Sequence, residues 1–294
     1  MNTINNFPEI SHLVALLDDP DDEVASVVRE RILSMGLPVA GLLRSLFHSS
    51  ENKTVTCRIE SLITDIESDQ AFEALIAWRQ EKDPDLLKGL CLINRLIRPM
   101  VSIEHIFDVI HNVSRDVWME LSDQKTVMEQ IHLLNHVFYK RVGFKAEDPF
   151  LEELDKALLD KTTETKRANP IVMGLLYTII AGQAGIPVTA VAFPGGFLPA
   201  YLNLEGQVQF YINVCQHGEI FGHQQLITSL RNFGLSIPDN QFAPCDATTL
   251  SSIYAESLSF MADNKGDKEM ELKTEKVIEL LGSKRFLMVE EEDD

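Results

Sequence analysis

The stretch that decides the fold runs from Asn169 to Leu202 and reads NPIVMGLLYTIIAGQAGIPVTAVAFPGGFLPAYL. Asn169 is a favourable N-cap residue, and Pro170 suits the first position of a helix, where no amide donor is needed. The following residues are apolar almost all round the helix, up to a stop signal at Gly185. We therefore expect a helix that is buried at the centre of a domain.

Three strand-like runs come after this helix. They are VTAVAF (188–193), FLPAYLNL (197–204) and VQFYINVC (208–215). In the third run, apolar residues alternate with polar ones, which is the period of a half-buried strand. A buried helix followed by a small antiparallel sheet predicts an α+β core, which we place at residues 146–240.

The residues before this core, 1–145, predict a helical N-terminal part. It begins with LVALL, an Asp19-Pro20-Asp21-Asp22 turn and apolar residues at helical spacing, a pattern typical of one HEAT-type hairpin. Further helices are expected at 55–66 and 70–81, among others. His132 and His136 are four residues apart, but no carboxylate accompanies them, so we predict no metal site.

The residues after the core predict a C-terminal helical hairpin over 241–289. Its two helices, 247–262 and 267–281, are separated by a turn at Gly266. The final residues, 290–294, are five consecutive acids, a composition that predicts a disordered tail.

Composition narrows the classes of partner. The 294 residues are 45% hydrophobic and 24% charged, with a formal net charge of −19. So acidic a chain disfavours nucleic acid, which is bound by basic side chains that neutralise phosphates. No apolar run is long enough to span a membrane, and the first residues do not resemble a secretory signal. The scattered cysteines predict a cytoplasmic protein without a zinc site or disulfide scaffold: Cys57, Cys91, Cys215 and Cys245.

The decisive stretch, together with the later FYINVCQHGEIF, resembles the bacterial transglutaminase-like family associated with the name SirB. That family typically reads Gly-Asn-(Pro or Cys)-Ile-Ser-Leu, then Gly-Val-x-Phe-Pro-Gly-His-Phe-Leu, then Ile-Asp-Pro-Phe. Upstream, the Asp-Pro-Asp hairpin, DLLKGLCLINRLIRP and LLNHVFYKRVGF extend the resemblance to about residues 10–230. It implies a transglutaminase/papain-like core, and the C-terminal hairpin resembles the TPR-like unit often appended to such cores.

The resemblance also implies where catalytic residues should stand. Such cores use a Cys at the start of the central helix, a His on a strand and an Asp or Asn on the next strand. Here the helix start contains Pro170 and no Cys, Ser or Thr, while Gly196 occupies the His position and Asn213 the acid position. The resemblance therefore implies a degenerate site.

The sequence leaves three functions open, and we expect a cofactor in none of them. The first is a catalytically inactive protein with a regulatory, protein-binding or ligand-binding role. Its ligand would bind in the cleft that corresponds to the catalytic cleft of the family, and the lining would be Asn169, Tyr177, Phe193, Phe197 and Tyr211.

The second function is a cysteine hydrolase or acyltransferase with a migrated site, in which Cys215 pairs with His217 or His223. The third is a helical adaptor with a structural core, for which an apolar patch in the first 120 residues would be a sign. A protein or peptide is the expected partner, and the sequence does not indicate the oligomeric state.

Overall fold

The structure is a computed structural model, which describes residues 9–17, 21–49, 52–122, 124–232, 234–235, 237–238 and 242–282. Contacts divide the chain into two compact units, Met1–Ile76 with Arg95–Val101 and Ala77–Asn94 with Ser102–Asp294. The predicted tail 290–294 lies outside the described residues, as do Asp19 and Pro20 of the predicted turn. The domain limits expected from the sequence, at 146 and 241, stay predictions.

The first unit is helical. Its described helices are α1 (Ile10–Leu16), α2 (Asp22–Leu33), α3 (Leu37–Ser49) and most of α4 (Lys53–Arg79). The prediction of two helices at 55–66 and 70–81 was wrong, because α4 is continuous across both. The intervening Glu67-Ser68-Asp69 contains neither glycine nor proline, and buried Glu67 accepts a hydrogen bond from Arg44.

The second unit surrounds the predicted central helix. Its other helices are α5 (Leu86–Ile97, mostly in this unit), α6 (Ile103–Glu120), α7 (Val127–Asn135), α8 (Leu154–Ala157), α9 (Leu159–Thr165), α11 (His223–Asn232), α12 (Ala247–Lys265) and α13 (Lys268–Leu281). The last two form the predicted C-terminal hairpin, which turns at Gly266 with φ +67°. A π-helical turn, η2 (His136–Arg141), continues directly from α7.

The main sheet of the second unit is antiparallel throughout. Its strands are β3 (Val188–Phe193), β4 (Gly196–Leu202), β5 (Val208–Asn213), β6 (Glu219–Phe221) and β7 (Ala243–Pro244), in the spatial order β6-β5-β4-β3-β7. A separate parallel pair joins β1 (Lys145–Ala146) to β2 (Arg167–Ala168). The third predicted strand ends at Asn213 rather than Cys215, because the chain turns there into a short 3₁₀ segment, η3 (Val214–Gln216).

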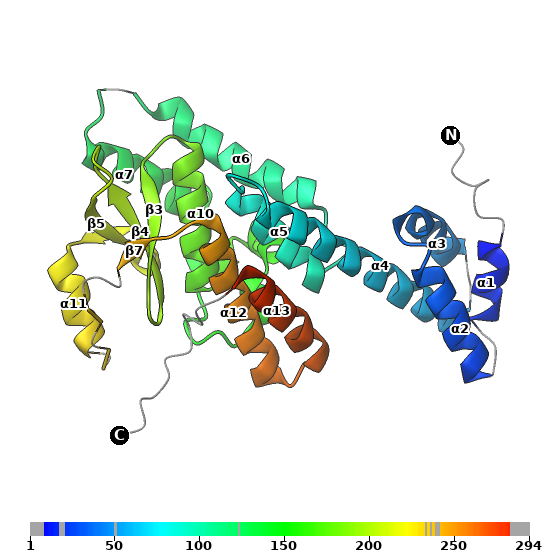
Figure 1. Ribbon diagram of the computed structural model, residues 1–294. Coiled ribbons are helices and arrows are strands. Elements are labelled where there is room, and N and C mark those ends of the chain that lie inside the picture. Colours follow the sequence, from blue (N-terminus) through cyan, green and yellow to red (C-terminus); the bar gives the residue numbers. More distant parts are fainter. Residues whose placement is uncertain are drawn as a thin grey trace, which may run out of the picture. The chain divides into compact units, whose positions relative to one another are not determined.

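Helices cover both faces of this sheet (Figure 1). α10 (Pro170–Gln183) is the predicted buried helix, and its residues from Val172 to Ala181 are all buried. On the opposite face, Leu226 and Leu230 of α11 pack with Val191 and other strand residues in one cluster. The prediction of an α+β fold with a buried central helix and a small antiparallel sheet is therefore confirmed. Among the described residues, the helices are too short or too polar to cross a membrane.

Candidate functional site

The start of α10 is closed by its own cap. The Asn169 side-chain oxygen accepts a hydrogen bond of 2.9 Å from the Val172 amide, and its backbone amide donates to the Lys156 carbonyl at 2.8 Å. Asn169 is fully buried, and its Nδ2 has no hydrogen-bond partner in the described part of the chain. Pro170 follows as the first helical residue. The helix start therefore presents a cap and a proline, neither of which is a nucleophile.

Gly196 is the first residue of β4 and lies directly opposite Phe193 across the β3–β4 turn. Its φ is +148°, a backbone conformation that residues with side chains rarely adopt. A Cβ at this position would meet no heavy atom within 4 Å. The position predicted for the histidine is thus open space beside a backbone that favours glycine.

Asn213, at the predicted acid position, turns its side chain to its own loop. Its Oδ1 accepts a hydrogen bond of 3.0 Å from the Cys215 amide and caps η3. This bond stabilises the path of the chain out of β5. The side chain of Asn213 therefore fixes a loop. In the family that the sequence resembles, the residue at this position is expected to orient an imidazole.

The three residues of the predicted migrated site have different partners. Cys215 is exposed as a residue, but partial desolvation of its thiol raises the pKa above the ordinary value. The His217 ring lies edge-on to Tyr139, with centroids 5.4 Å apart, and Nδ1 of His223 lies 3.2 Å from the hydroxyl of Tyr211. Among the described residues, the Cys215 sulfur makes no hydrogen bond to an imidazole.

A partly buried polar network holds the loop that carries Cys215 and His217. Tyr177 of α10 donates to Oδ1 of Asn135 at 2.7 Å, and Nδ2 of Asn135 donates to the Gly218 carbonyl at 3.0 Å. Tyr139 in η2 donates to the Val214 carbonyl at 3.1 Å. Burial raises the pKa of both tyrosines, so both hydroxyls remain donors at neutral pH.

The sequence did not predict this network, although one sign was present. Tyr177 is the one hydroxyphenyl group in a helix that is otherwise apolar over most of its surface, and a buried Tyr hydroxyl needs a partner. Gly218 has φ +76°, and a Cβ there would overlap the Asn135 amide. The close approach therefore requires glycine at 218.

The five predicted ligand-contacting residues do not share one wall. Phe193 and Tyr211 belong to the cluster that packs against α11. Phe197 lies on the α10 face, where its ring would be 3.0 Å from a Cβ added to Gly174. Because Phe193 and Tyr211 lie on one face of the sheet and Phe197 lies on the other, these residues form two separate groups and do not line one groove.

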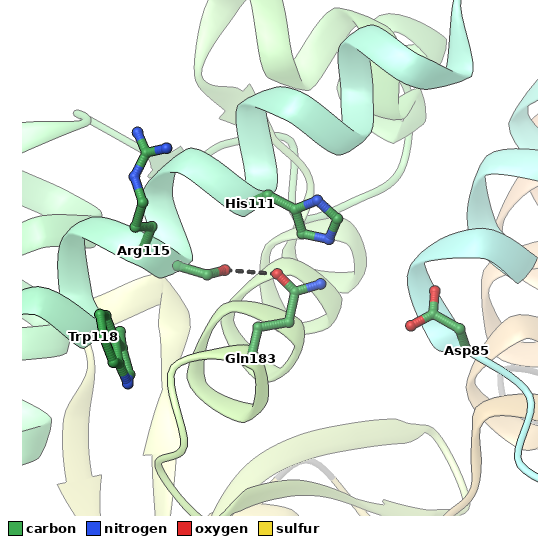
Figure 2. Close-up of a pocket in the computed structure, with 6 residues that line it drawn as sticks. Asp85, His111, Arg115, Trp118 and Gln183 are labelled. Atoms are coloured by element: carbon green, nitrogen blue, oxygen red, sulfur yellow. Dashed lines mark hydrogen bonds between the residues drawn. The ribbon is translucent and has the colours of Figure 1, made fainter.

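A depression of about 560 Å³ lies elsewhere on the second unit, beside α6. In Figure 2, His111 lies next to Gln183, Asp85 faces them, and Trp118 stands at the other end. Ser114 donates to Oε1 of Gln183 at 2.8 Å and so fixes the amide in the wall. Trp118 is 63% exposed. An exposed indole beside charged and amide groups is a suitable contact surface for a peptide.

Two comparisons with known proteins relate this geometry to a family. A relative, described as UPF0162 protein, from Vibrio cholerae serotype O1 (strain ATCC 39315 / El Tor Inaba N16961), is 22% identical over 165 residues. The match covers 53% of the chain and 61% of that relative, so the chain spans less than two thirds of the relative's length. The sequence pattern of the transglutaminase-like superfamily matches residues 104–253, just over half of the chain, and includes α10 and β3 to β6. The chain therefore belongs to the transglutaminase-like superfamily.

Proposed function

We propose that the chain is a non-catalytic, SirB-type member of this superfamily, which binds a protein or peptide in a regulatory role. The observation that carries the proposal is Gly196, because the strand position that holds a histidine in the resembling family has no side chain. General acid–base catalysis contributes roughly 10²–10⁴-fold and needs a group that can carry a proton. We also propose a cytoplasmic location, because the four cysteines are free.

The migrated site at Cys215 is the rival that can be tested directly. We expect the rate of Cys215 alkylation by iodoacetamide to rise with pH and to reach no plateau below about pH 8.5. The reason is that partial desolvation raises the thiol pKa and so favours the unreactive neutral form at pH 7. The rate is measured by mass spectrometry of the labelled peptide across a pH series.

The background for this measurement is Cys57→Ser, since Cys57 is exposed and would react as well. Cys91 is buried, and burial raises the pKa of Cys245 to about 12, so neither thiol competes strongly. The control is the Cys57→Ser/Cys215→Ser double variant, which should lose the labelled peptide. A rate that is already at its plateau at pH 7 would show an activated thiolate and would overturn the non-catalytic proposal.

For the binding role, we propose the depression beside α6 as the contact surface. Trp118 and Met119, at the end of this helix, are 63% and 68% exposed. Two adjacent large apolar side chains in water also favour the helical adaptor as a second candidate function. In both versions the ligand is a peptide segment that covers the indole.

Tryptophan fluorescence tests this surface. The chain has two tryptophans, and Trp78 is fully buried, so a peptide that covers Trp118 should shift the emission to shorter wavelength through that residue alone. The probe is a set of short synthetic peptides of mixed sequence, titrated into the full chain. Trp118→Phe keeps most of the apolar surface and should remove the shift. A shift that persists in Trp118→Phe, or no shift with any peptide, would argue against this surface.

A further inference from the structure

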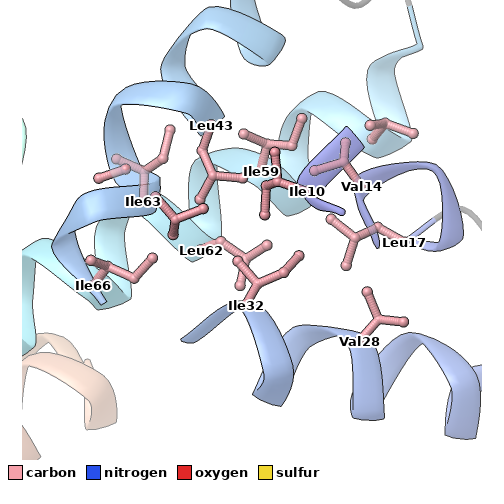
Figure 3. Packing of buried hydrophobic residues seen from close by; sticks show 13 residues of the cluster. Ile10, Val14, Leu17, Val28, Ile32, Leu43, Ile59, Leu62, Ile63 and Ile66 are labelled. Carbon is pink, nitrogen blue, oxygen red and sulfur yellow. The ribbon is translucent and has the colours of Figure 1, made fainter. Parts of the chain in front are cut away.

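The first unit contains a small hollow on one side of α2 and α4. Its volume is about 220 Å³, and its lining is Leu17, Ala25, Ser26, Arg29 and Arg58. Figure 3 shows Leu17, Val28, Ile59 and Leu62 in the apolar core of this unit. Ala25, Ser26 and Arg29 share one side of α2, because residues three and four apart are neighbours on a helix. The hollow therefore combines two apolar side chains, Leu17 and Ala25, with two guanidinium groups and a hydroxyl.

Arg29 is held in place by α4. Its Nη2 forms an ion pair with Asp65, and its Nη1 donates to Oγ of Ser61 at 3.3 Å. A guanidinium group has five N–H donors in a rigid fork, and these bonds use two of them. Arg29 is thus pre-positioned at the edge of the hollow, with donors to spare.

Arg58 lies one turn before Ser61 on α4, and its guanidinium group differs from that of Arg29 in its partners. Its Nη1 is buried and has no hydrogen-bond partner, and it forms no ion pair with any residue that the structure describes. A buried donor without an acceptor costs about 1–3 kcal/mol, and more when it is charged. Such a group in a folded protein calls for an explanation, of which a bound ion is one.

The positive charges that line the hollow favour an anion as the ligand. The chain as a whole is strongly acidic, at −19, yet this hollow brings together two arginines that repel each other. Asp65 neutralises Arg29, so among the residues that the structure describes Arg58 supplies the positive charge that has no ion-pair partner. Guanidinium forks match the oxygens of phosphate in bidentate geometry. An anion would therefore supply the missing acceptor and remove the repulsion.

The volume limits the size of the ligand. Since a water molecule occupies about 30 Å³ in the liquid, the hollow has space for roughly seven. Sites for drug-sized ligands begin at about 300 Å³. We propose that Arg58, with Arg29 and Ser26, binds a phosphate group, either as inorganic phosphate or as a small phosphomonoester.

The test is a titration of the isotope-labelled full chain, followed by NMR at constant ionic strength. Sodium phosphate replaces sodium chloride stepwise, and parallel titrations use phosphoserine and sodium acetate. We expect saturable shifts of the Ala25, Ser26 and Arg29 amides with phosphate or phosphoserine, and none with acetate. The tighter of the two phosphate ligands identifies the source of the group. Chemical shifts are the readout because phosphate also stabilises proteins by exclusion from their surface.

Two arginine variants give a matched comparison. Arg58→Met should weaken binding about 10- to 100-fold, the effect of one charge-assisted hydrogen bond. Arg31→Met removes the same charge from α2, but Arg31 is paired with Glu9 at 3.3 Å and does not line the hollow, so binding should be unchanged. Arg58→Lys keeps the charge without the fork and should weaken binding to a lesser degree, which tests the site if Arg58→Met fails to fold.

Three results would overturn the proposal. The first is an absence of saturable shifts with both phosphate ligands. The second is equal affinity in Arg58→Met and Arg31→Met. The third is acetate binding as tight as phosphate binding, which would remove the selectivity for phosphate. None of these results bears on Cys215 or Trp118, so the phosphate site and the proposed function are tested independently of each other.

Discussion

Replacement of Trp78 by alanine is expected to destabilise the second unit by about 3–5 kcal/mol, the usual cost of deleting a buried aromatic side chain. Trp78 is fully buried, and its indole N–H donates to the Asp85 carbonyl at 2.8 Å. The ring lies so close to Gly89 of α5 that a Cβ there would overlap it. The change would thus leave a cavity, and the Asp85 carbonyl would keep only its hydrogen bond from the Gly89 amide at 3.1 Å. Guanidinium unfolding followed by circular dichroism measures the loss.

The control for this prediction is Trp118→Ala. Trp118 is 63% exposed, so its truncation should change the free energy of unfolding by no more than about 0.5 kcal/mol. Equal losses in Trp78→Ala and Trp118→Ala would show that the contact between Trp78 and Gly89 does not contribute to the core.

The second large effect is expected at Gly218, where alanine should destabilise the protein by about 2–5 kcal/mol. A non-glycine residue at φ +76° costs about 1–2 kcal/mol. The added Cβ would also overlap the Asn135 amide and break the bonds that it makes with Tyr177 and the Gly218 carbonyl. Leaving a buried hydroxyl unpaired costs a further 1–3 kcal/mol or so. Thermal or guanidinium unfolding measures the sum.

Gly206→Ala is a matched control for that substitution. Gly206 has φ +77°, almost the same as Gly218, but a Cβ there would meet nothing within 4 Å. Its replacement should therefore cost only the backbone part. If Gly218→Ala and Gly206→Ala have the same free energy of unfolding, the network around Asn135 makes no net contribution.

The parts of the fold that the sequence predicted are those with local determinants. Asn169 and Pro170 start α10 where the capping pattern places it, and β3 has its predicted bounds. α11, β6 and β7 were missed for a different reason. β7 pairs with Val191 and Ala192, more than 50 residues earlier in the chain, and α11 is fixed by packing against the sheet. Such long-range contacts leave little trace in a short window of sequence.

In the candidate site, too, the residues that could be predicted are those with a local sequence pattern around them. Pro170 at a helix start and Asn213 at a strand end could be placed because each has a local pattern around it. The network could not, since Asn135 is 42 residues from Tyr177 and 83 residues from Gly218. Both Phe193 and Phe197 were predicted to line the cleft, whereas the register Phe193↔Gly196 leaves Phe197 on the opposite face of the sheet from Phe193.

The positive φ of Gly196 also bears on how this protein can evolve. A histidine that arises by mutation at 196 would meet backbone strain of about 1–3 kcal/mol at once. Any catalytic benefit would appear only after a nucleophile had also replaced a residue at the proline-led helix start. Because the cost comes first and the benefit needs a second mutation, selection would remove the intermediate. On the proposal that the chain is non-catalytic, the backbone at Gly196 therefore disfavours the appearance of a His-dependent activity by single mutations.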